Sequence, residues 1–382
     1  MKVLHIIAGL DQGGAEGCLC RLIKSDKEDR HSVVSLLDDG VHGAALREAG
    51  IPVHTIGMRR GRPSLKGWLK LARTVKSIQP DVVQTWMCHA DLLGGLAAWI
   101  TGAGVVVWGI RNTLLDNKTT SLSTRLVVRI SALLSPVIPS AIVSCSATAA
   151  QQHIQIGYDS RKMRTIPNGI DLDRFRPDQA SRAEMRSEMG VTADECLFGM
   201  VARCDPQKDH KNLLLALRML ADLPGAHWKC VLAGRGMDSS NAALRDLIEN
   251  LSLTSRILLL GSRDDIPRIM NGLDCHVLSS AYGEGFPNVV AEAMACGVPC
   301  VATDVGDARQ IIGNTGWVVP PRDETALAGA LGEVLGERGS EKWKIRRQQA
   351  QGAIHENFSL DRMRDAFRNV WLSCVPEGKK AA

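Results

Sequence analysis

Residues 165–177, TIPNGIDLDRFRP, separate two halves of the sequence that show the same pattern. The stretch holds two prolines and an Asn-Gly pair and has no helical periodicity, which is typical of a linker. On either side of it, short apolar runs alternate with helical stretches. We therefore predict two doubly wound, Rossmann-like α/β domains that face a cleft.

The predicted strands are continuously apolar rather than alternating, which favours parallel sheets covered on both faces. They lie at 2–10, 31–37, 81–86, 104–110 and 141–146 in the first half, and at 196–202, 228–234, 256–261, 275–280 and 299–303 in the second. We assign residues 1–166 to a first domain, 167–178 to the linker and 179–355 to a second domain. Residues 356–382, with an amphipathic helix at 360–372, are expected to pack back toward the first domain.

The composition is that of a globular protein, with 45% hydrophobic and 23% charged residues and a net charge of +5. Aromatic residues make up only 4%, which argues against a lectin-like module with aromatic sugar platforms. The eleven cysteines have no paired or metal-like spacing, and no signal peptide or transmembrane-length apolar run is apparent. We therefore expect reduced thiols and a cytoplasmic protein. No aromatic residues interleave with the cations, so nucleic acid is not an expected partner.

A glycine-rich turn, GLDQGGAE at 9–16, follows the first predicted strand and opens a helix. The free N–H groups and the dipole of a helix start attract an anion. Gly13 and Gly14 would let the backbone approach a phosphate or a sugar. An ordinary tight turn is the alternative, and a dinucleotide fingerprint is disfavoured because the glycines do not form G-x-G-x-x-G.

A basic loop, VARCDPQKDHKN at 201–212, connects a predicted strand to a helix. Arg203 and Lys208 flank the mouth of this loop, at the strand end where open α/β sheets bind ligands. Two such cations suit a diphosphate, although a solvated basic loop is the alternative. Gly234, after the next strand, offers another close backbone approach.

The segment SSAYGEGFPNVVAEAMACGVP at 279–299 combines two carboxylates with a helix start. Glu284 lies on the loop before the helix and Glu292 lies in its first two turns, so both are expected at one strand end. Carboxylates accept pairs of sugar hydroxyls, and backbone N–H groups at a helix start accept phosphate oxygens. A helix start decorated with favourable acids is the alternative. The residues between the acids are assigned to substrate binding: Gly285, Phe286, Pro287, Asn288 and Val289.

The E-x7-E spacing of Glu284 and Glu292, followed by EAMACGVPCVATDVG, resembles the family-four retaining glycosyltransferases of GT-B fold, of the bacterial polysaccharide type. Further segments occur in the order of that family, so the resemblance covers nearly the whole chain. They are GGAE at 13–16, IPNGID at 166–171, ARCDPQKDHKNLLLA at 202–216 and GSRDDIPRIMNGLD at 261–274.

The resemblance implies transfer of a hexosyl or N-acetylhexosaminyl group from a nucleotide-diphosphate sugar, with UDP favoured over GDP. The acceptor would be a glycan or a lipid-linked saccharide in cell-surface polysaccharide or lipopolysaccharide synthesis. Arg203 and Lys208 would hold the diphosphate and stabilise the leaving group, with no metal and no resident cofactor. Glu292 would bind the ribose, and Glu284 the transferred sugar.

The resemblance also implies that the base lies near Arg263 and Asp264, and that Gly13 and Gly14 line the acceptor side. Many family members carry a histidine after a first-domain strand. The comparable loop here reads GIRNT, which places Arg111 and Asn112 there. His89, in TWMCHADLL, is the other candidate for contact with the reacting sugar.

Two further patterns bear on metal binding and on membrane contact. Asp171 and Asp173 form a D-x-D pair, but they follow an Asn-Gly turn in the linker, so we interpret them as turn residues and not as a metal site.

Residues 49–80 hold seven basic residues and no acidic one, and apolar residues repeat at helical spacing from Leu65. Residues 59–76 are therefore predicted to contact anionic lipid at the inner face of the plasma membrane, with an ordinary surface helix as the alternative.

The sequence leaves two other functions open. A nucleotide-sugar epimerase has the same two-domain fold, but needs an acid and a base around the sugar. A non-catalytic saccharide-binding protein is disfavoured by the intact set of Arg203, Lys208, Glu284 and Glu292.

Overall fold

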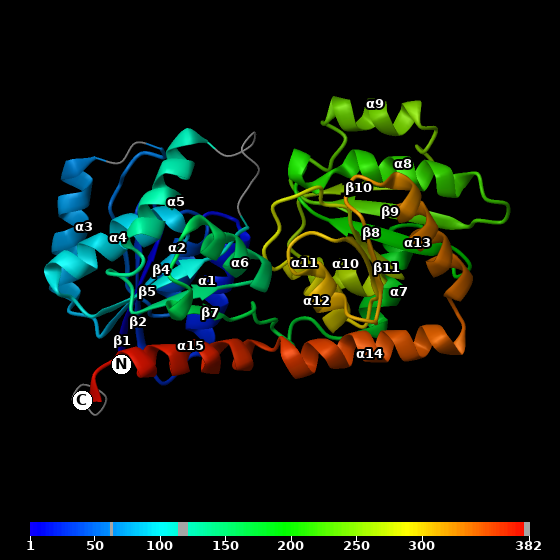
Figure 1. The fold of residues 1–382 in the computed structure, drawn as a ribbon. Helices are drawn as coiled ribbons and strands as arrows, with labels where there is room; N and C mark the ends of the chain where they lie inside the picture. The colour runs from blue at the N-terminus through cyan, green and yellow to red at the C-terminus, as the bar shows by residue number, and fades with distance from the viewer. Residues whose placement is uncertain (62–63, 114–120, 378–382) are drawn as a thin grey trace. The chain divides into compact units, whose positions relative to one another are not determined.

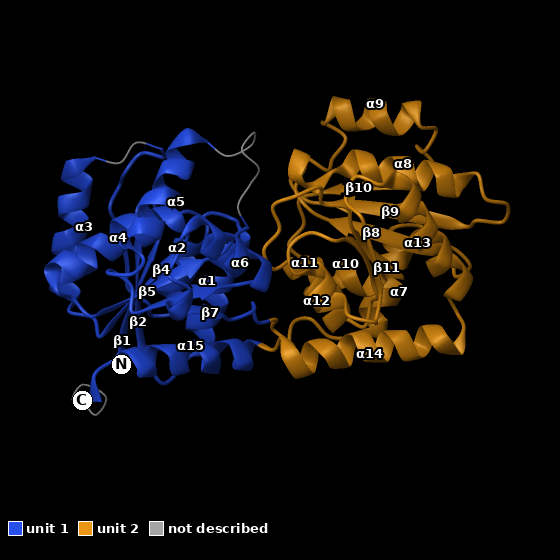
Figure 2. Cartoon of the chain, viewed as in Figure 1, with its two compact units in different colours: residues 1–169, 360–382 blue, residues 170–359 orange. Residues whose placement is uncertain are grey.

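A computed structural model describes residues 1–61, 64–113 and 121–377 of the chain (Figure 1). It divides into two compact units (Figure 2). Unit 1 comprises Met1–Gly169 and Leu360–Ala382, and unit 2 comprises Ile170–Ser359. The division thus falls inside the segment 167–178 that the sequence marks as a linker, and residues from Ile170 onward belong to unit 2.

Unit 1 is built on a seven-stranded parallel sheet of order β3-β2-β1-β4-β5-β6-β7. Its strands are β1 (Lys2–Ile7), β2 (Arg30–Ser35), β3 (Val53–Thr55), β4 (Val82–Trp86), β5 (Val105–Ile110), β6 (Ala141–Ser144) and β7 (Met163–Thr165). Its α-helices are α1 (Gly14–Ser25), α2 (His42–Glu48), α3 (Leu65–Ile78), α4 (Cys88–Thr101), α5 (Leu122–Leu134), α6 (Ala147–Ile156) and α15 (Leu360–Cys374). The strand order reverses between β1 and β4, which makes their carboxyl ends the topological switch point of unit 1.

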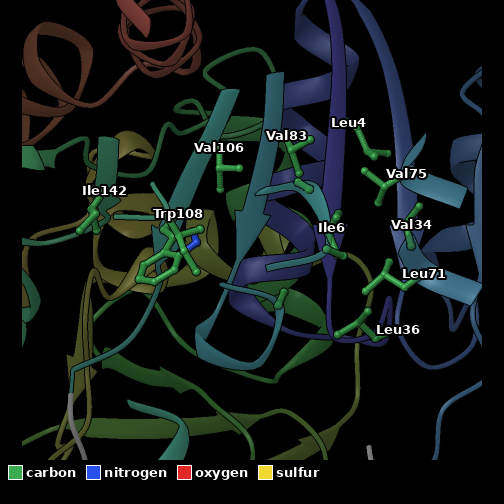
Figure 3. Packing of buried hydrophobic residues seen from close by; sticks show 14 of the residues in the cluster. Leu4, Ile6, Val34, Leu36, Leu71, Val75, Val83, Val106, Trp108 and Ile142 are labelled. Atoms are coloured by element: carbon green, nitrogen blue, oxygen red, sulfur yellow. The ribbon is translucent and has the colours of Figure 1, made fainter. Parts of the chain in front are cut away.

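Alternate residues of each strand enter separate cores on the two faces of this sheet. Leu4 and Ile6 of β1 pack on the face covered by α3 and α4, where Leu71 and Val75 meet them (Figure 3). Val3 and Ile7 pack on the opposite face. Both faces of the sheet are therefore buried from solvent, which explains why the strand sequences are unbroken apolar runs.

The carboxyl-terminal helix α15 belongs to the second of these cores. Phe367 and Trp371 are buried there, and the Phe367 ring stacks on Trp86 of β4 with 5.8 Å between centroids. The indole Nε1 of Trp371 donates to Gln84 Oε1 at 3.0 Å. These contacts attach residues 360–374 firmly to unit 1, although about 190 residues of unit 2 precede them in the chain.

Unit 2 repeats the doubly wound plan with a six-stranded parallel sheet of order β10-β9-β8-β11-β12-β13. Its strands are β8 (Cys196–Val201), β9 (Trp228–Ala233), β10 (Ile257–Gly261), β11 (Cys275–Leu278), β12 (Cys300–Thr303) and β13 (Trp317–Val319). Its α-helices are α7 (Gln179–Glu188), α8 (His210–Ala221), α9 (Ala242–Asn250), α10 (Ile266–Gly272), α11 (Asn288–Ala295), α12 (Ala308–Ile312), α13 (Glu324–Glu337) and α14 (Glu341–Asn357). The switch point lies between β8 and β11. The predicted class of two Rossmann-like α/β domains is confirmed.

Candidate functional site

The loops that follow β8 and β11 meet at the switch point of unit 2 through an ion pair. Lys208 Nζ lies 2.5 Å from Glu284 Oε1, and Ser280 Oγ donates to the same oxygen at 2.5 Å. Glu284 is only 7% exposed. A buried carboxylate loses its hydrogen bonds to water, and the Lys208 ammonium and the Ser280 hydroxyl replace them.

Backbone contacts fix the position of Lys208. The residue ends a short 3₁₀ turn, Pro206–Lys208, that is capped by Asp205. The Lys208 carbonyl accepts a hydrogen bond from Ser279 Oγ at 2.9 Å, and the Gln207 carbonyl accepts one from Ala281 N at 2.8 Å. These hydrogen bonds hold the two loops beside each other. The backbone therefore places Lys208 close to Glu284 before their side chains pair.

Arg203 lies on the same loop, but its guanidinium is more exposed than the Lys208 ammonium. Its Nε donates to Asp205 Oδ2 at 3.1 Å and its Nη2 to Gln207 Oε1 at 3.1 Å. Burial tends to raise the pKa of Asp205, but the Gln207 N–H and the Arg203 guanidinium outweigh it and hold that pKa below its usual value. Arg203 therefore presents positive charge to solvent at the carboxyl end of β8.

Two glycines keep the backbone bare beside these side chains. Gly234 has φ +140°, and a Cβ there would lie 2.1 Å from the Ala202 carbonyl oxygen. Gly306 has φ +63°, and a Cβ there would lie 2.5 Å from the carbonyl oxygens of Glu284 and Gly285. Both positions need glycine for conformation and for space. Gly234 was singled out in the sequence, whereas Gly306 was quoted only as part of a longer segment.

The segment between the two acids reaches helix α11 as expected. Asn288 begins α11 after Pro287, and half-buried Glu292 lies about one turn later. Phe286 is buried, and its ring packs against Phe358 with 5.4 Å between centroids. Its side chain therefore supports the segment, which leaves only its backbone to meet a ligand. Gly285 is buried before it, and Val289 follows as the second residue of α11.

Arg263, expected near the base, is held by two carboxylates. Its Nε and Nη2 donate to both oxygens of Asp265 at 2.7 and 2.6 Å, and its Nη1 donates to Glu188 Oε1 at 2.9 Å. The carbonyl of Asp264 accepts from Arg174 Nη2 at 3.4 Å. The arginine thus anchors helix α7 to the loop after β10.

Unit 1 has a pocket of about 330 Å³ at the carboxyl ends of β1 to β4. Its walls come from the ends of these strands, the loop after β3 and helix α5. The lining residues are Ala8, Gly9, Asp11, Glu16, Leu36, Leu37, Met58, Arg59, Arg60, Gly61, Met87, His89, Leu93, Ser123 and Val127.

His89 is the predicted first-domain residue that the structure places in this pocket. It lies in the first turn of α4, with Nδ1 3.5 Å from Cys88 Sγ, and burial lowers its pKa. The glycine-rich turn contributes Glu16, whose pKa is raised chiefly by burial and further by the nearby Asp11. Glu16 was not singled out from the sequence, although GGAE contains it.

Met87, beside His89, has an unusual backbone. Its φ of 74° and ψ of 154° fall in a region that is nearly exclusive to glycine. Its N–H donates to the Gly109 carbonyl at 2.8 Å, which helps to hold this conformation. Backbone strain of this kind is concentrated at functional sites. Because Met87 lines the pocket, its strain is consistent with a functional role for the pocket.

The remaining first-domain candidates are not among the residues that line the pocket. Arg111 stacks on Trp86 with 4.7 Å to the ring centroid, and its Nη2 donates to Cys18 Sγ at 2.8 Å and to Asn168 Oδ1. Asn112, next in the chain, is half-buried. Gly13 caps α1, and a Cβ on it would lie 2.2 Å from Glu16 Oε2; Gly14 begins the helix.

The D-x-D pair forms a turn, as expected. Asp171 Oδ1 accepts hydrogen bonds from the backbone N–H groups of Asp173 and Arg174 at 3.2 and 3.1 Å. Among the residues that the structure describes, no helix is long and apolar enough to cross a membrane.

Comparison with known proteins adds to this geometry. A family model described as "Glycosyltransferase Family 4" matches residues 12–174, and one described as "Glycosyl transferases group 1" matches residues 195–337. The chain is 24% identical, over 318 residues, to an Escherichia coli UDP-Gal:alpha-D-GlcNAc-diphosphoundecaprenol alpha-1,3-galactosyltransferase, covering 81% of this chain and 80% of the relative. It is 28% identical over 313 residues to EpsF of Bacillus subtilis, covering 79% of each.

Solved structures agree on the fold. HepE of Anabaena, in complex with UDP, superposes with a TM-score of 0.85 at 24% identity, covering 98% of this chain and 100% of HepE. A glycosyltransferase from Rickettsia africae gives a TM-score of 0.84 at 20% identity, covering 98% of this chain and 99% of the other.

The fold and the matched families define a class, the GT-B glycosyltransferases built from two Rossmann-like units. Within that class, the chain is a glycosyltransferase of the family-4 type.

Proposed function

We propose that this enzyme transfers a hexosyl or N-acetylhexosaminyl group, with retention of configuration, from a UDP-sugar to a glycan or lipid-linked saccharide in cell-surface polysaccharide synthesis. The observation that carries the proposal is the Lys208–Glu284 pair at the switch point of unit 2. The name of the Escherichia coli relative includes a UDP-sugar donor and a lipid-diphosphate-linked acceptor, and HepE has been solved with UDP-glucose. These two proteins favour UDP and a lipid-linked acceptor.

Unit 2 would hold the donor. The diphosphate would bind Lys208 and the exposed guanidinium of Arg203, because both cations lie on one loop at the end of β8. Lys208 would then be shared between the phosphate oxygens and Glu284, which screens the carboxylate from the diphosphate. Glu284 would accept hydroxyls of the transferred sugar, and Glu292, on α11, those of the ribose.

The chemistry would proceed on one face of the sugar. The bond between C1 and the leaving phosphate oxygen breaks as the bond from C1 to the acceptor oxygen forms on the same side, which retains configuration. The leaving phosphate takes the proton of the acceptor hydroxyl, so no separate base is needed. Arg203 and Lys208 stabilise the charge that develops on the diphosphate, which is the task that a metal ion would otherwise perform. Gly13, Gly14 and His89 would lie on the acceptor side.

The protein would act at the inner face of the plasma membrane, through residues 59–76. On α3, Lys66, Arg73 and Lys76 are exposed, and Leu65 is 74% exposed at its start. Lys70 is partly engaged, since its Nζ donates to the carbonyls of Thr55 and Ile56. Arg62 and Pro63 of this segment lie outside the described residues. Sedimentation with phosphatidylglycerol vesicles tests the contact, and equal sedimentation with neutral vesicles would contradict it.

The donor assignment is tested by incubating the protein with UDP-, GDP- and ADP-sugars and following melting temperature and products. UDP and UDP-sugars are expected to raise the melting temperature most. A transfer product with retained configuration at C1 is expected when a saccharide acceptor is added. An epimerised nucleotide sugar formed from donor alone would reject transfer in favour of epimerisation.

A further inference from the structure

We infer that the pocket of unit 1 binds the apolar chain of an anionic amphiphile, with Arg59 and Arg60 holding its phosphate or diphosphate. This inference rests on the proposed function, and it specifies the acceptor as a saccharide carried on a lipid phosphate or diphosphate whose chain enters the protein. The occupant is thus the acceptor itself rather than a lipid of the bilayer.

Most of the half-buried and buried lining of the pocket suits an alkyl chain better than a saccharide. Its half-buried and buried side chains are mostly aliphatic or thioether: Leu36, Leu37, Met58, Met87, Leu93 and Val127. Among the described residues that line it there is no Trp, Tyr or Phe. Sugar hydroxyls placed against such walls would lose hydrogen bonds to water without replacement, whereas an alkyl chain would gain by leaving water. A volume of about 330 Å³ is that of a small-molecule site.

The charged lining residues divide by exposure. Arg59, Arg60 and Asp11 are exposed, so two cations and one carboxylate lie at the opening. Glu16 is half-buried, and burial raises its pKa. The result is an interior lined mostly by apolar side chains and an opening with one more cation than anions, which is complementary to a chain that carries a phosphate.

Helix α5 provides a path by which a chain longer than the pocket leaves it. Ser123 and Val127 line the pocket, while the residues just before them on the helix, Leu122 and Leu126, are 79% and 59% exposed. Apolar side chains that stay exposed beside a pocket opening are costly unless something covers them. The distal part of the chain, or the bilayer around it, would do so.

The strain at Met87 is an independent indication that this pocket is used. The residue keeps a φ of 74° and a ψ of 154° where glycine would be relaxed. The fold holds the Met87 backbone in this conformation, and the Met87 side chain is part of the apolar lining of the pocket. An unused hollow gives no reason to retain such a conformation.

The test is a calorimetric titration of the full-length protein with dodecyl phosphate below its micellar concentration, with inorganic phosphate as the chainless probe. Wild-type protein is expected to bind dodecyl phosphate at least about tenfold more tightly than inorganic phosphate, because the chain is buried. Val127→Asp should remove most of that difference. Leu133→Asp is the matched control on the same helix, where the side chain is 79% exposed and does not line the pocket, and it should bind like wild type.

A second variant keeps the inference testable if Val127→Asp fails to fold. Gly9 lines the pocket, and a Cβ there would lie 3.5 Å from Leu37 Cδ1, which is an ordinary contact. Gly9→Ala should therefore fold, narrow the pocket and weaken dodecyl phosphate binding relative to wild type. Unchanged binding of dodecyl phosphate by both variants would overturn the inference. So would equal affinity for the two-chain lipid dihexanoylphosphatidylglycerol, because that would make the pocket a site for bilayer lipid.

UDP binding, measured on the same samples, separates this inference from the proposed function. If UDP binds all variants as it binds wild type while Val127→Asp loses the probe, both stand. If UDP fails to bind wild type, the proposed function fails, whatever the probe does.

Discussion

The Lys208 ammonium and the Glu284 carboxylate are joined at 2.5 Å, although 76 residues separate them in the chain. Each stands on a loop at the carboxyl end of a central strand of unit 2, and Ser280 completes the shell of the carboxylate. A cation that suits a diphosphate is thus already paired with an acid that suits sugar hydroxyls. This pairing is what the donor site is expected to use.

Lys208→Met is expected to destabilise the protein and to impair catalysis. It leaves Glu284 buried without its cation, which should lower the free energy of unfolding by about 3 kcal/mol. Loss of charge at the leaving diphosphate should lower kcat by about 10²- to 10³-fold. Urea unfolding and steady-state kinetics measure the two effects.

The double variant Lys208→Met/Glu284→Gln separates them. It removes both charges and keeps an oxygen for Ser280, so most of the lost stability should return while kcat stays low. Recovery of activity together with stability would show that the pair is only structural.

Gly306→Ala is expected to disrupt the donor loop. The added Cβ would meet the carbonyl oxygens of Glu284 and Gly285 at 2.5 Å, and alanine is strained at φ +63°. We expect a loss of more than about 1 kcal/mol in unfolding free energy and weaker UDP binding. Gly329→Ala, in helix α13 with nothing within 4 Å, is the control and should be neutral or stabilising. Similar behaviour of the two variants would mean that the loop tolerates displacement.

Position 87 is expected to prefer glycine to alanine. Alanine shares the strain of methionine at φ 74° and ψ 154°, whereas glycine is relaxed there, so Met87→Gly should be more stable than Met87→Ala by about 1–3 kcal/mol. At Met219, exposed on helix α8, the order should reverse by about 1 kcal/mol. Thermal denaturation of the four variants gives both differences, and alanine being the better residue at both positions would refute the strain.

Asp91 is expected to make unfolding depend on pH near neutrality. Burial raises its pKa to about 7, and hydrogen bonds from Thr85 and Gly109 only partly oppose this. Between its ordinary value of 3.8 and about 7, the native state keeps the proton while the unfolded chain releases it. Stability should therefore fall as pH rises, on the order of 1 kcal/mol per pH unit, relative to Asp91→Asn. Urea midpoints from pH 4.5 to 8 measure this difference, and parallel curves would contradict it.

The sequence was sufficient for the longer strands and for the loops that carry Lys208 and Glu284. Continuous apolar runs identified ten strands because both faces of each sheet are covered. The strands β3, β7 and β13 were missed because three residues each are too few to show a period. Helices α13 and α14 were not predicted, although α13 packs against α8 and α14 against α11.

Contacts across the chain were beyond prediction from the sequence. Ser280 is an ordinary serine in a quoted segment, and only the folded chain shows that it donates to Glu284. The strain at Met87 has no sequence signal, because methionine is not a residue expected at a positive φ. In the first domain, three candidates stood open, and the structure places His89 in the pocket while Arg111 is tied to Cys18.

The most direct test of the donor site is a calorimetric titration of UDP into wild-type, Lys208→Ala and Lys344→Ala proteins. Lys344 is an exposed lysine of helix α14, paired with the exposed Glu341, and serves as the matched control. UDP is expected to bind wild type and Lys344→Ala alike, and Lys208→Ala at least about tenfold more weakly, through loss of a charge-assisted contact. Equal affinity of all three proteins for UDP would contradict a donor site built on Lys208 and Glu284.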